Sequence, residues 1–174
     1  IEQFLDGDFY LEKRMRLKIE SPIVANSLYA LNEVVVEKID PCRTVRLALE
    51  INGDFFTSYA TDGLIVATPT GSTAYSMSAR GPIIDPMHQA ILLTPVAPHS
   101  LFDRALVLSP DDQLKISVLP DCGASFAVDG NVSGKLELGD SITCTSAEKP
   151  ALLVSFGGSN FHQALKEKFG LSDR

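Results

Sequence analysis

Residues 62–78 read Asp62-Gly63-Leu64-Ile65-Val66-Ala67-Thr68-Pro69-Thr70-Gly71-Ser72-Thr73-Ala74-Tyr75-Ser76-Met77-Ser78. The stretch predicts a short apolar strand, then a turn, then the start of a helix built from small residues. Pro69 and Gly71 end the strand, and Ser72 or Thr73 can cap the first turn of the helix. Unpaired backbone N–H groups at such a start attract phosphate, and small side chains let a ligand approach closely. We therefore expect the functional site to lie here.

The composition favours a globular domain with a sizeable core. The chain has 174 residues, of which 45% are hydrophobic, so we treat residues 1–174 as one domain or one large piece of a two-domain enzyme. Its net charge of −7 disfavours non-specific binding to nucleic acid or to an anionic membrane. A local anion site built from backbone donors remains compatible with that charge.

The cysteines and the chain start indicate a cytoplasmic protein. Cys42, Cys122 and Cys144 match neither a zinc spacing nor a paired disulfide framework, so we expect free thiols in a reducing compartment. No apolar run approaches the roughly 18 residues of a membrane-spanning helix, and the first residues lack the basic region of a secretory signal. The sequence begins without Met, which is consistent with a fragment or a processed product.

Apolar and polar residues alternate with a period of two from residue 9 to residue 19, which predicts one long, half-buried strand. Four cations lie along it, namely Lys13, Arg14, Arg16 and Lys18. They could form an anion site or a solvated strand face. The alternation already explains most of the pattern and favours the solvated face.

A second alternating pair of segments predicts a β-hairpin. Residues 45–51 and 55–60 flank Asn52-Gly53, and both of these turn residues tolerate a positive φ. Shorter apolar runs predict further strands at 31–37, 63–67, 90–94, 105–108, 114–118, 124–128, 141–145 and 152–156.

Helical signals are few. One helix is expected to start near Ser72 and to end by Gly81-Pro82, because proline cannot continue it. A second is expected over 161–169, with Asn160 as its N-cap, Gln163 at the capping-box position and Gly170 at its end. About ten short strands with two helices predict a mainly β domain of two packed antiparallel sheets, similar to a β-sandwich.

Several short motifs together resemble one known family. They are Asn32-Glu33 after an apolar run, Asp62-Gly63 before the buried strand, Thr70-Gly71-Ser72-Thr73-Ala74-Tyr75 after it, the proline-rich turn at 95–101, and Val128-Asp129-Gly130. In this order and spacing the chain resembles the C-terminal domain of NAD kinases, from Arg14 to the last helix. The resemblance implies an enzyme that phosphorylates the 2′-hydroxyl of the adenosine ribose of NAD to give NADP.

The resemblance also implies what this chain lacks. Family members carry a Gly-Gly-Asp-Gly-Thr motif in an N-terminal α/β domain, and that motif does not occur in this sequence. We therefore expect no catalytic residue and no metal ligands in this chain, which alone should be inactive. ATP or polyphosphate, with Mg²⁺ accompanying ATP, would bind through the missing domain, and the relatives suggest a homo-oligomer, either a dimer or a tetramer.

The NAD-binding residues implied by the resemblance come from three segments. Tyr75 could stack on an aromatic base, while Asn32 and Glu33 suit ribose hydroxyls and adenine edges. The complete implied set is Asn32, Glu33, Asp62, Thr73, Ala74, Tyr75, Ser76, Met77, Ser78 and Asn131.

Three alternatives remain open from the sequence. The chain could be a non-catalytic module that senses NAD or NADP, because it lacks the phosphate-loop motif. It could belong to a lipid kinase of the same superfamily, although its acidic charge disfavours a membrane-directed surface. It could also be a structural β-sandwich that mediates interactions and binds no ligand.

Overall fold

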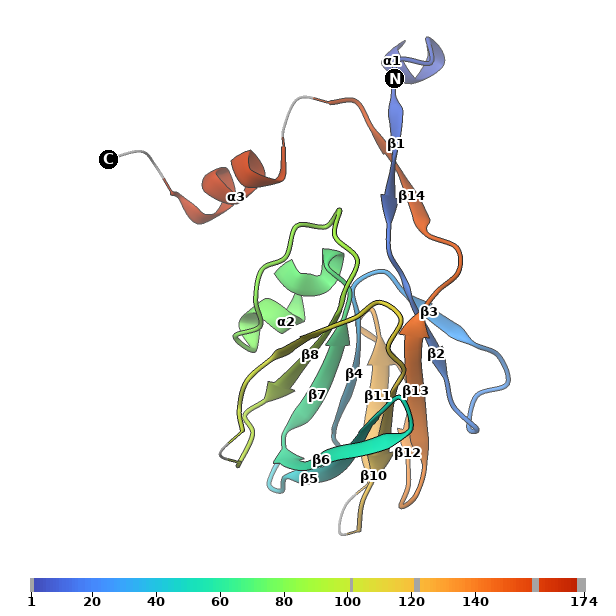
Figure 1. The fold of residues 1–174 in the computed structure, drawn as a ribbon, viewed down its shortest axis with the longest axis vertical. Coiled ribbons are helices and arrows are strands. Elements are labelled where there is room, and N and C mark those ends of the chain that lie inside the picture. Colours follow the sequence, from blue (N-terminus) through green and yellow to red (C-terminus); the bar gives the residue numbers. More distant parts are fainter. Residues whose placement is uncertain (1, 101, 121–122, 158–159, 172–174) are drawn as a thin grey trace.

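Two six-stranded antiparallel sheets form the body of the molecule (Figure 1). The computed structural model describes residues 2–100, 102–120, 123–157 and 160–171. The first sheet has the order β3-β2-β13-β10-β5-β6, with bounds Leu28–Ala30, Leu17–Glu20, Ser141–Ser146, Leu114–Val118, Val45–Ile51 and Asp54–Thr61. The second has the order β12-β11-β4-β7-β8-β9, with bounds Asn131–Leu136, Ala124–Val128, Glu33–Lys38, Gly63–Ala67, Ile91–Val96 and Leu106–Leu108. The predicted mainly β fold of packed antiparallel sheets is confirmed.

The main core lies between the two sheets. Leu47 and Leu114 from the first sheet share one buried cluster with Leu64 and Phe126 from the second. A smaller cluster covers the outer face of the second sheet, where Ile65 packs with neighbours that include Ala79 and Ile84. Since β7 is covered on both faces, all five of its residues are buried, which explains its uninterrupted apolar sequence.

The predicted hairpin joins β5 to β6. Asn52 and Gly53 have φ values of 55° and 87°, so both adopt the left-handed conformation that this turn requires. The Asn52 side chain also accepts a hydrogen bond from the backbone N–H of Gln113 at 2.9 Å and donates one to Asp112 at 2.8 Å. The turn is therefore tied to the segment that precedes β10.

The expected single strand over residues 9–19 is wrong. The segment forms two strands, β1 (Tyr10–Arg14) and β2, and they belong to different sheets. β1 pairs with β14 (Ala151–Ser155) in a separate two-stranded ribbon that leaves the body (Figure 1). At the crossing point, Arg16 donates two hydrogen bonds to the carbonyl of Lys149. Alternation continues through this crossing, so the pattern alone does not show it.

The helix expected from Ser72 to Gly81 is also different in the structure. A 3₁₀-helix, η1 (Thr70–Thr73), is followed by one α-helical turn, α2 (Tyr75–Ser78), with Ala74 in a non-helical conformation between them. Neither element has a side-chain cap, so the expected capping by Ser72 or Thr73 is wrong. The Ser72 hydroxyl instead exchanges two hydrogen bonds with the backbone of Ile84.

The C-terminal helix α3 (Phe161–Phe169) has the predicted bounds and ends. Asn160 accepts a hydrogen bond from the backbone N–H of Gln163 at 2.9 Å, and Gly170 adopts φ 60°. All nine α3 residues are described and none is buried. A short N-terminal helix, α1 (Glu2–Leu5), and two strands, β3 and β12, were not expected from the sequence.

Two further expectations concern thiols and membranes. Cys42 and Cys144 are free thiols, as expected, and burial raises the pKa of Cys144 to about 12. Cys122 lies outside the described residues. Within the described ranges, every helix is too short or too polar to cross a bilayer.

Candidate functional site

The turn after β7 is bonded directly to the start of β4. The Thr68 hydroxyl donates to the carbonyl of Leu31 at 2.6 Å, and the Thr68 backbone N–H donates to the carbonyl of Asn32 at 2.9 Å. The same hydroxyl accepts the backbone N–H of Gly71 at 3.1 Å. The buried Thr68 therefore holds two of the sequence motifs together, although Asn32 and Thr68 are 36 positions apart in the sequence.

Gly71 is required by this close approach. A Cβ atom at this position would lie 2.1 Å from the carbonyl oxygen of Asn32 and 2.5 Å from its carbonyl carbon. Backbone atoms cannot move aside as a flexible side chain can. The glycine therefore allows the turn to pack on the Asn32-Glu33 segment, where any larger residue would force the two apart.

Asp129 fixes the other side of the same segment. Its carboxylate accepts three backbone N–H groups, from Leu31 at 2.7 Å, Asn32 at 2.8 Å and Glu33 at 3.0 Å. Its own backbone N–H donates to the carbonyl of Glu33 at 3.0 Å. A carboxylate that accepts several backbone donors forms strong, charge-assisted hydrogen bonds. Sequence reasoning noted Asp129 in a motif but assigned it no role, because its partners lie nearly 100 residues away.

Glu33 is a buried carboxylate that is only partly satisfied. It is 7% exposed, and its Oε2 has no hydrogen-bond partner among the described residues. Burial raises the pKa of Glu33 and the nearby charge of Asp129 raises it further, while a hydrogen bond from the Tyr75 backbone lowers it. The oxygen is enclosed by protein atoms in this conformation, so a ligand hydroxyl would reach it only after a local rearrangement.

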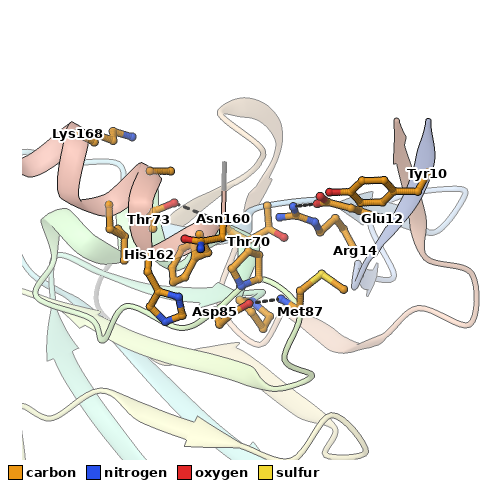
Figure 2. A pocket seen from close by; sticks show the side chains of 15 residues that line it. Tyr10, Glu12, Arg14, Thr70, Thr73, Asp85, Met87, Asn160, His162 and Lys168 are labelled. Carbon is orange, nitrogen blue, oxygen red and sulfur yellow. Dashed lines mark hydrogen bonds and ion pairs between the residues drawn. The ribbon is translucent and has the colours of Figure 1, made fainter. Parts of the chain in front are cut away.

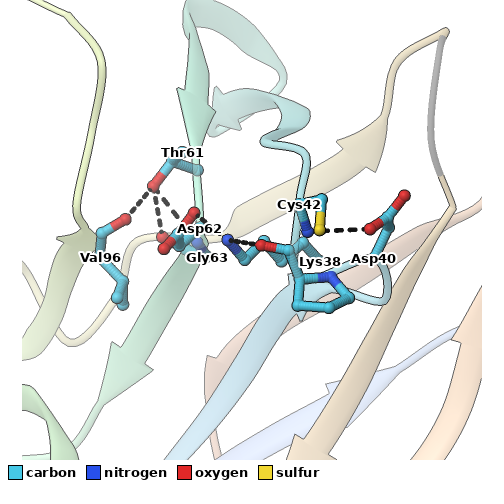
Figure 3. Close-up of polar contacts among 8 residues, drawn as sticks. Lys38, Asp40, Cys42, Thr61, Asp62, Gly63 and Val96 are labelled. Atoms are coloured by element: carbon cyan, nitrogen blue, oxygen red, sulfur yellow. Dashed lines mark hydrogen bonds and ion pairs between the residues drawn. The ribbon is translucent and has the colours of Figure 1, made fainter.

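A small cavity of about 300 Å³ lies beside the start of β7 and is lined by Asp62 and Tyr75. Asp62 forms an ion pair with Lys38 at 2.7 Å, and the Lys38 ammonium also donates to the carbonyl of Pro41 at 3.1 Å (Figure 3). Burial raises the pKa of the Tyr75 hydroxyl, and the negative charges of Glu37 and Asp62 add to this effect. The Tyr75 side chain is 40% exposed, so its ring is accessible for stacking.

A larger cavity of about 850 Å³ lies beside η1 (Figure 2). Thr70 and Thr73 line it from η1, Arg14 from β1, and His162 and Lys168 from α3. The cavity therefore lies between the body, the two-stranded ribbon and the C-terminal helix. Its lining is rich in hydrogen-bonding groups and carries charges of both signs.

The structure places Asn32 and Glu33 beside the Gly71 turn and divides three further residues of the implied NAD-binding set between two cavities. Asn32 and Glu33 pack against the turn that contains Gly71, Thr73 lines the larger cavity, and Asp62 and Tyr75 line the smaller one. The contacts of these residues with NAD stay a prediction.

The remaining residues of the set differ in their accessibility. Ser76 is fully buried, and its hydroxyl lies 2.9 Å from that of Thr94, so it serves packing in this conformation. Ala74 and Met77 are half-buried, and Ser78 is exposed. Asn131 is exposed and donates weakly to the carbonyl of Asp129 at 3.4 Å. A role for these five residues in binding also stays a prediction.

The described residues contain no group of three or more His, Cys, Asp or Glu side chains arranged to hold a metal ion.

Curated relatives match the chain along most of its length. An NAD kinase of Desulforamulus reducens is 39% identical over 172 residues, which cover 97% of this chain and 60% of the relative. An NAD kinase of Heliobacterium modesticaldum is 38% identical and is covered to 61% of its length. The chain therefore spans about 60% of the length of these relatives.

Solved structures and a family model agree with these matches. A yeast NADH kinase complexed with NADH superposes with a TM-score of 0.89 at 29% identity, covering 99% of this chain and 53% of the other. An NAD kinase from Archaeoglobus fulgidus in complex with ATP gives a TM-score of 0.76 at 26% identity, with coverages of 97% and 62%. The model of the ATP-NAD kinase C-terminal domain matches residues 31–156. Since this match covers more than half of the sequence, the chain belongs to the ATP-NAD kinase C-terminal domain family.

Proposed function

We propose that this chain is the NAD-binding part of an NAD kinase, which transfers a phosphoryl group from ATP to the 2′-hydroxyl of the adenosine ribose of NAD. The observation that carries the proposal is the convergence of Asn32 and Glu33 with the Gly71 turn, held from one side by Thr68 and from the other by Asp129. This arrangement fixes an unsatisfied buried acceptor beside a turn of small residues. Membership of the family supports the same function.

In this proposal the chain binds and orients the acceptor. After a local rearrangement, the Oε2 of Glu33 accepts a ribose hydroxyl, and the Asn32 amide can both donate to and accept from the sugar or the base. The Tyr75 ring offers a stacking surface. Holding the hydroxyl in one orientation lowers the entropic part of the barrier to phosphoryl transfer.

We assign the phosphoryl-transfer chemistry to the part of the relatives that this chain does not cover. The general base and the loop that holds the donor phosphates would come from there, with ATP or polyphosphate as the donor. Mg²⁺ would be held through the phosphates of ATP. We also propose a cytoplasmic homo-oligomer, a dimer or a tetramer, in which this chain alone is inactive.

A second candidate function is a module that senses NAD or NADP without catalysis. It would use the same Asn32-Glu33 segment and Gly71 turn for binding and would not need the Gly-Gly-Asp-Gly-Thr motif, which does not occur within these 174 residues. Both candidates require dinucleotide binding, and they differ in whether a catalytic partner domain restores NADP formation. Co-expression with the N-terminal domain of a relative, followed by an assay for NADP, separates them.

Calorimetric titration with NAD and NADP tests the proposed binding role. Tyr75→Ala should weaken NAD binding about tenfold, because base stacking contributes about 1–3 kcal/mol. The melting temperature should change little, since the ring is 40% exposed. Tyr29→Ala is the matched control, because Tyr29 is 48% exposed on β3, outside both cavities. Wild-type chain that binds neither dinucleotide, or equal losses in the two variants, would contradict the proposal.

A further inference from the structure

Lys38 and Asp62 lie directly opposite each other at one end of the second sheet. The paired register of β4 and β7 ends with Glu37 opposite Gly63, so the next position sets residue 38 opposite residue 62. The Lys38 backbone N–H donates to the carbonyl of Asp62 at 3.0 Å. Side chains of directly opposed residues on antiparallel strands are neighbours. The register itself therefore brings this cation and this carboxylate together.

The Lys38 ammonium joins two walls of the smaller cavity. Its Nζ lies 2.7 Å from Oδ1 of Asp62, just before β7, and donates to the carbonyl of Pro41 at 3.1 Å, in the turn that follows β4 (Figure 3). All three residues line the cavity of about 300 Å³. The side chain of Asp62 is 36% exposed and that of Lys38 is 23% exposed. A ligand in the cavity can therefore reach the pair without displacing protein atoms.

The charge balance of this cavity depends on Lys38. Glu37 and Asp62 supply two carboxylates, and Lys38 is the one cation among the described residues that line the cavity. Burial raises the pKa of the Tyr75 hydroxyl, and the charges of Glu37 and Asp62 raise it further, so both carboxylates act on this space. Without Lys38, neither negative charge would be offset, and the cavity would repel an anionic ligand such as a dinucleotide.

The ion pair also sets the position of the Asp62 carboxylate. An aspartate side chain can adopt several staggered positions unless a partner selects one of them. Lys38 engages Oδ1 of Asp62, so that oxygen is held by the protein and Oδ2 remains as an acceptor for a ligand donor. Because Lys38 is tied to the Pro41 carbonyl as well, its ammonium is fixed by two acceptors that belong to different elements.

We propose that Lys38 is a positioning residue of the NAD site, which holds the Asp62 carboxylate in the cavity wall and offsets its charge. The inference rests on the proposed function, because Asp62 belongs to the implied NAD-binding set. It deepens that function by adding a residue that none of the sequence motifs includes. A lysine at the end of an apolar strand ordinarily marks a solvated strand end, and only the register places Lys38 opposite Asp62.

A double-mutant cycle on NAD affinity tests the proposal, by calorimetric titration of the full chain. The variants are Lys38→Met, Asp62→Asn and the double variant. We expect each single variant to weaken NAD binding several-fold. The double variant should bind no more weakly than the weaker single variant, because both residues act through one contact. The melting temperatures should change little, since the pair is partly exposed to solvent.

Two further variants separate positioning from a general loss of charge. Lys38→Arg keeps a cation with several N–H donors, so it should bind NAD nearly as well as wild type. Lys115→Met is the matched control, because Lys115 forms an ion pair with Glu50 at 3.1 Å and lies outside both cavities. It loses the same charge as Lys38→Met, and its affinity for NAD should equal that of wild type.

A measurement without NAD checks the pair itself. A hydrogen-bonded ammonium exchanges its protons slowly with water, so the proton–nitrogen resonance of the Lys38 ammonium should be observable by NMR in the wild-type chain. Its absence from Lys38→Met assigns it. The resonance should broaden or disappear in Asp62→Asn, and a resonance that Asp62→Asn leaves unchanged would overturn the proposal.

The contradicting outcomes are distinct from a failure of the proposed function. The positioning role is overturned if Lys38→Met binds NAD as well as wild type or more tightly, or if the two single losses add in the double variant. It is also overturned if Lys38→Arg does not restore binding or if Lys115→Met loses as much affinity. A wild-type chain that binds neither NAD nor NADP, but whose Lys38 resonance responds to Asp62→Asn, would refute the proposed function and support Lys38 as the residue that holds Asp62.

Discussion

The central strand β7 and the ribbon strand β14 are both rich in apolar residues, but their surroundings are opposite. All five residues of β7 are buried, because β4 and β8 flank it and packed layers cover both of its faces. β14 carries Leu152, Leu153 and Val154 in succession, and all three are exposed. Among the strands of the described residues, β1 alone pairs with it. An apolar run thus indicates that a strand can be buried. Whether the strand is buried depends on the elements that pack against it.

The body and the ribbon should contribute unequally to the free energy of unfolding. An isolated two-stranded ribbon is marginally stable, whereas the strands of the body share one continuous core. We therefore expect the free energy of unfolding to reside in the body. The ribbon and α3 should open at lower cost, since few of their apolar groups leave water on folding.

The largest expected effect comes from truncating matched leucines in the two regions. Leu93→Ala removes a fully buried side chain from β8 and should lower the free energy of unfolding by about 3 kcal/mol. Leu153→Ala removes a side chain that is 38% exposed and should cost less than about 1 kcal/mol. Urea denaturation followed by circular dichroism measures both. Equal losses would show that the ribbon belongs to the cooperative core.

Gly71→Ala tests the close approach inside the body. Its Cβ would collide with the backbone of Asn32, so we expect a loss of about 2–3 kcal/mol and weaker NAD binding. Gly53→Ala is the control, because its Cβ meets nothing within 4 Å and only the φ of 87° opposes it. That strain should cost about 1 kcal/mol. A Gly71→Ala variant as stable as Gly53→Ala would contradict the packing of the turn on Asn32.

Glu33→Gln should change the stability of the fold by a smaller amount, and this change should depend on pH. The pKa of Glu33 is raised by burial and by the charge of Asp129, so its neutral form is favoured on folding. The stability that the neutral carboxyl contributes is fully present below its unfolded pKa and is lost as the pH rises through its folded pKa. Glutamine stays neutral, so the variant should melt at a higher temperature than wild type at pH 7, and the difference should vanish under acidic conditions.

Two measurements complete the Glu33 experiment. NAD binding should weaken in Glu33→Gln, because the variant lacks the carboxylate that is proposed to face the ligand. The fold should nevertheless be more stable, since a group that is retained for binding can lower stability. Glu137→Gln is the control, since Glu137 is exposed and its substitution should change neither property. A melting temperature that falls at pH 7 would refute the assignment of Glu33 as an unsatisfied acceptor.

Asp62→Asn should have the smallest effect on stability. The pair between Asp62 and Lys38 is partly solvent-exposed, and such pairs contribute about 0–1 kcal/mol. NAD affinity should nevertheless fall several-fold if Asp62 faces the ligand. Glu50→Gln, which removes a comparable pair with Lys115 outside both cavities, controls for the lost charge. An unchanged dissociation constant in Asp62→Asn would leave Asp62 with a structural role.

Much of the fold could be predicted because the information is local. The Asn52-Gly53 turn specifies positive φ values, and the alternation at 114–118 and 124–128 gives the bounds of β10 and β11 without error. The two strands that were missed are short or weakly apolar. β3 has three residues, and β12 has a single buried residue, Leu136, so neither gives a strong pattern.

The candidate site was harder to predict than the fold. The motifs around Asn32 and Gly71 were recognised, but the sequence does not show that a Cβ at residue 71 would collide with Asn32. The carboxylate of Asp129 was missed for the same reason, since its three donors lie on a distant strand start. Contacts between residues far apart in the chain leave no periodic signal.

The sequence by itself determined the family, the antiparallel β architecture and the C-terminal helix with its Asn160 and Gly170 ends, because local backbone preferences and motif spacing encode them. The tertiary structure decided where the pattern at 9–19 divides, which apolar strand is buried, and which of four neighbouring cations enters a cavity. The physical reason is that hydrophobic burial and hydrogen-bond satisfaction depend on what packs against a residue. The alternation of apolar and polar residues along a strand does not indicate which element packs against that strand.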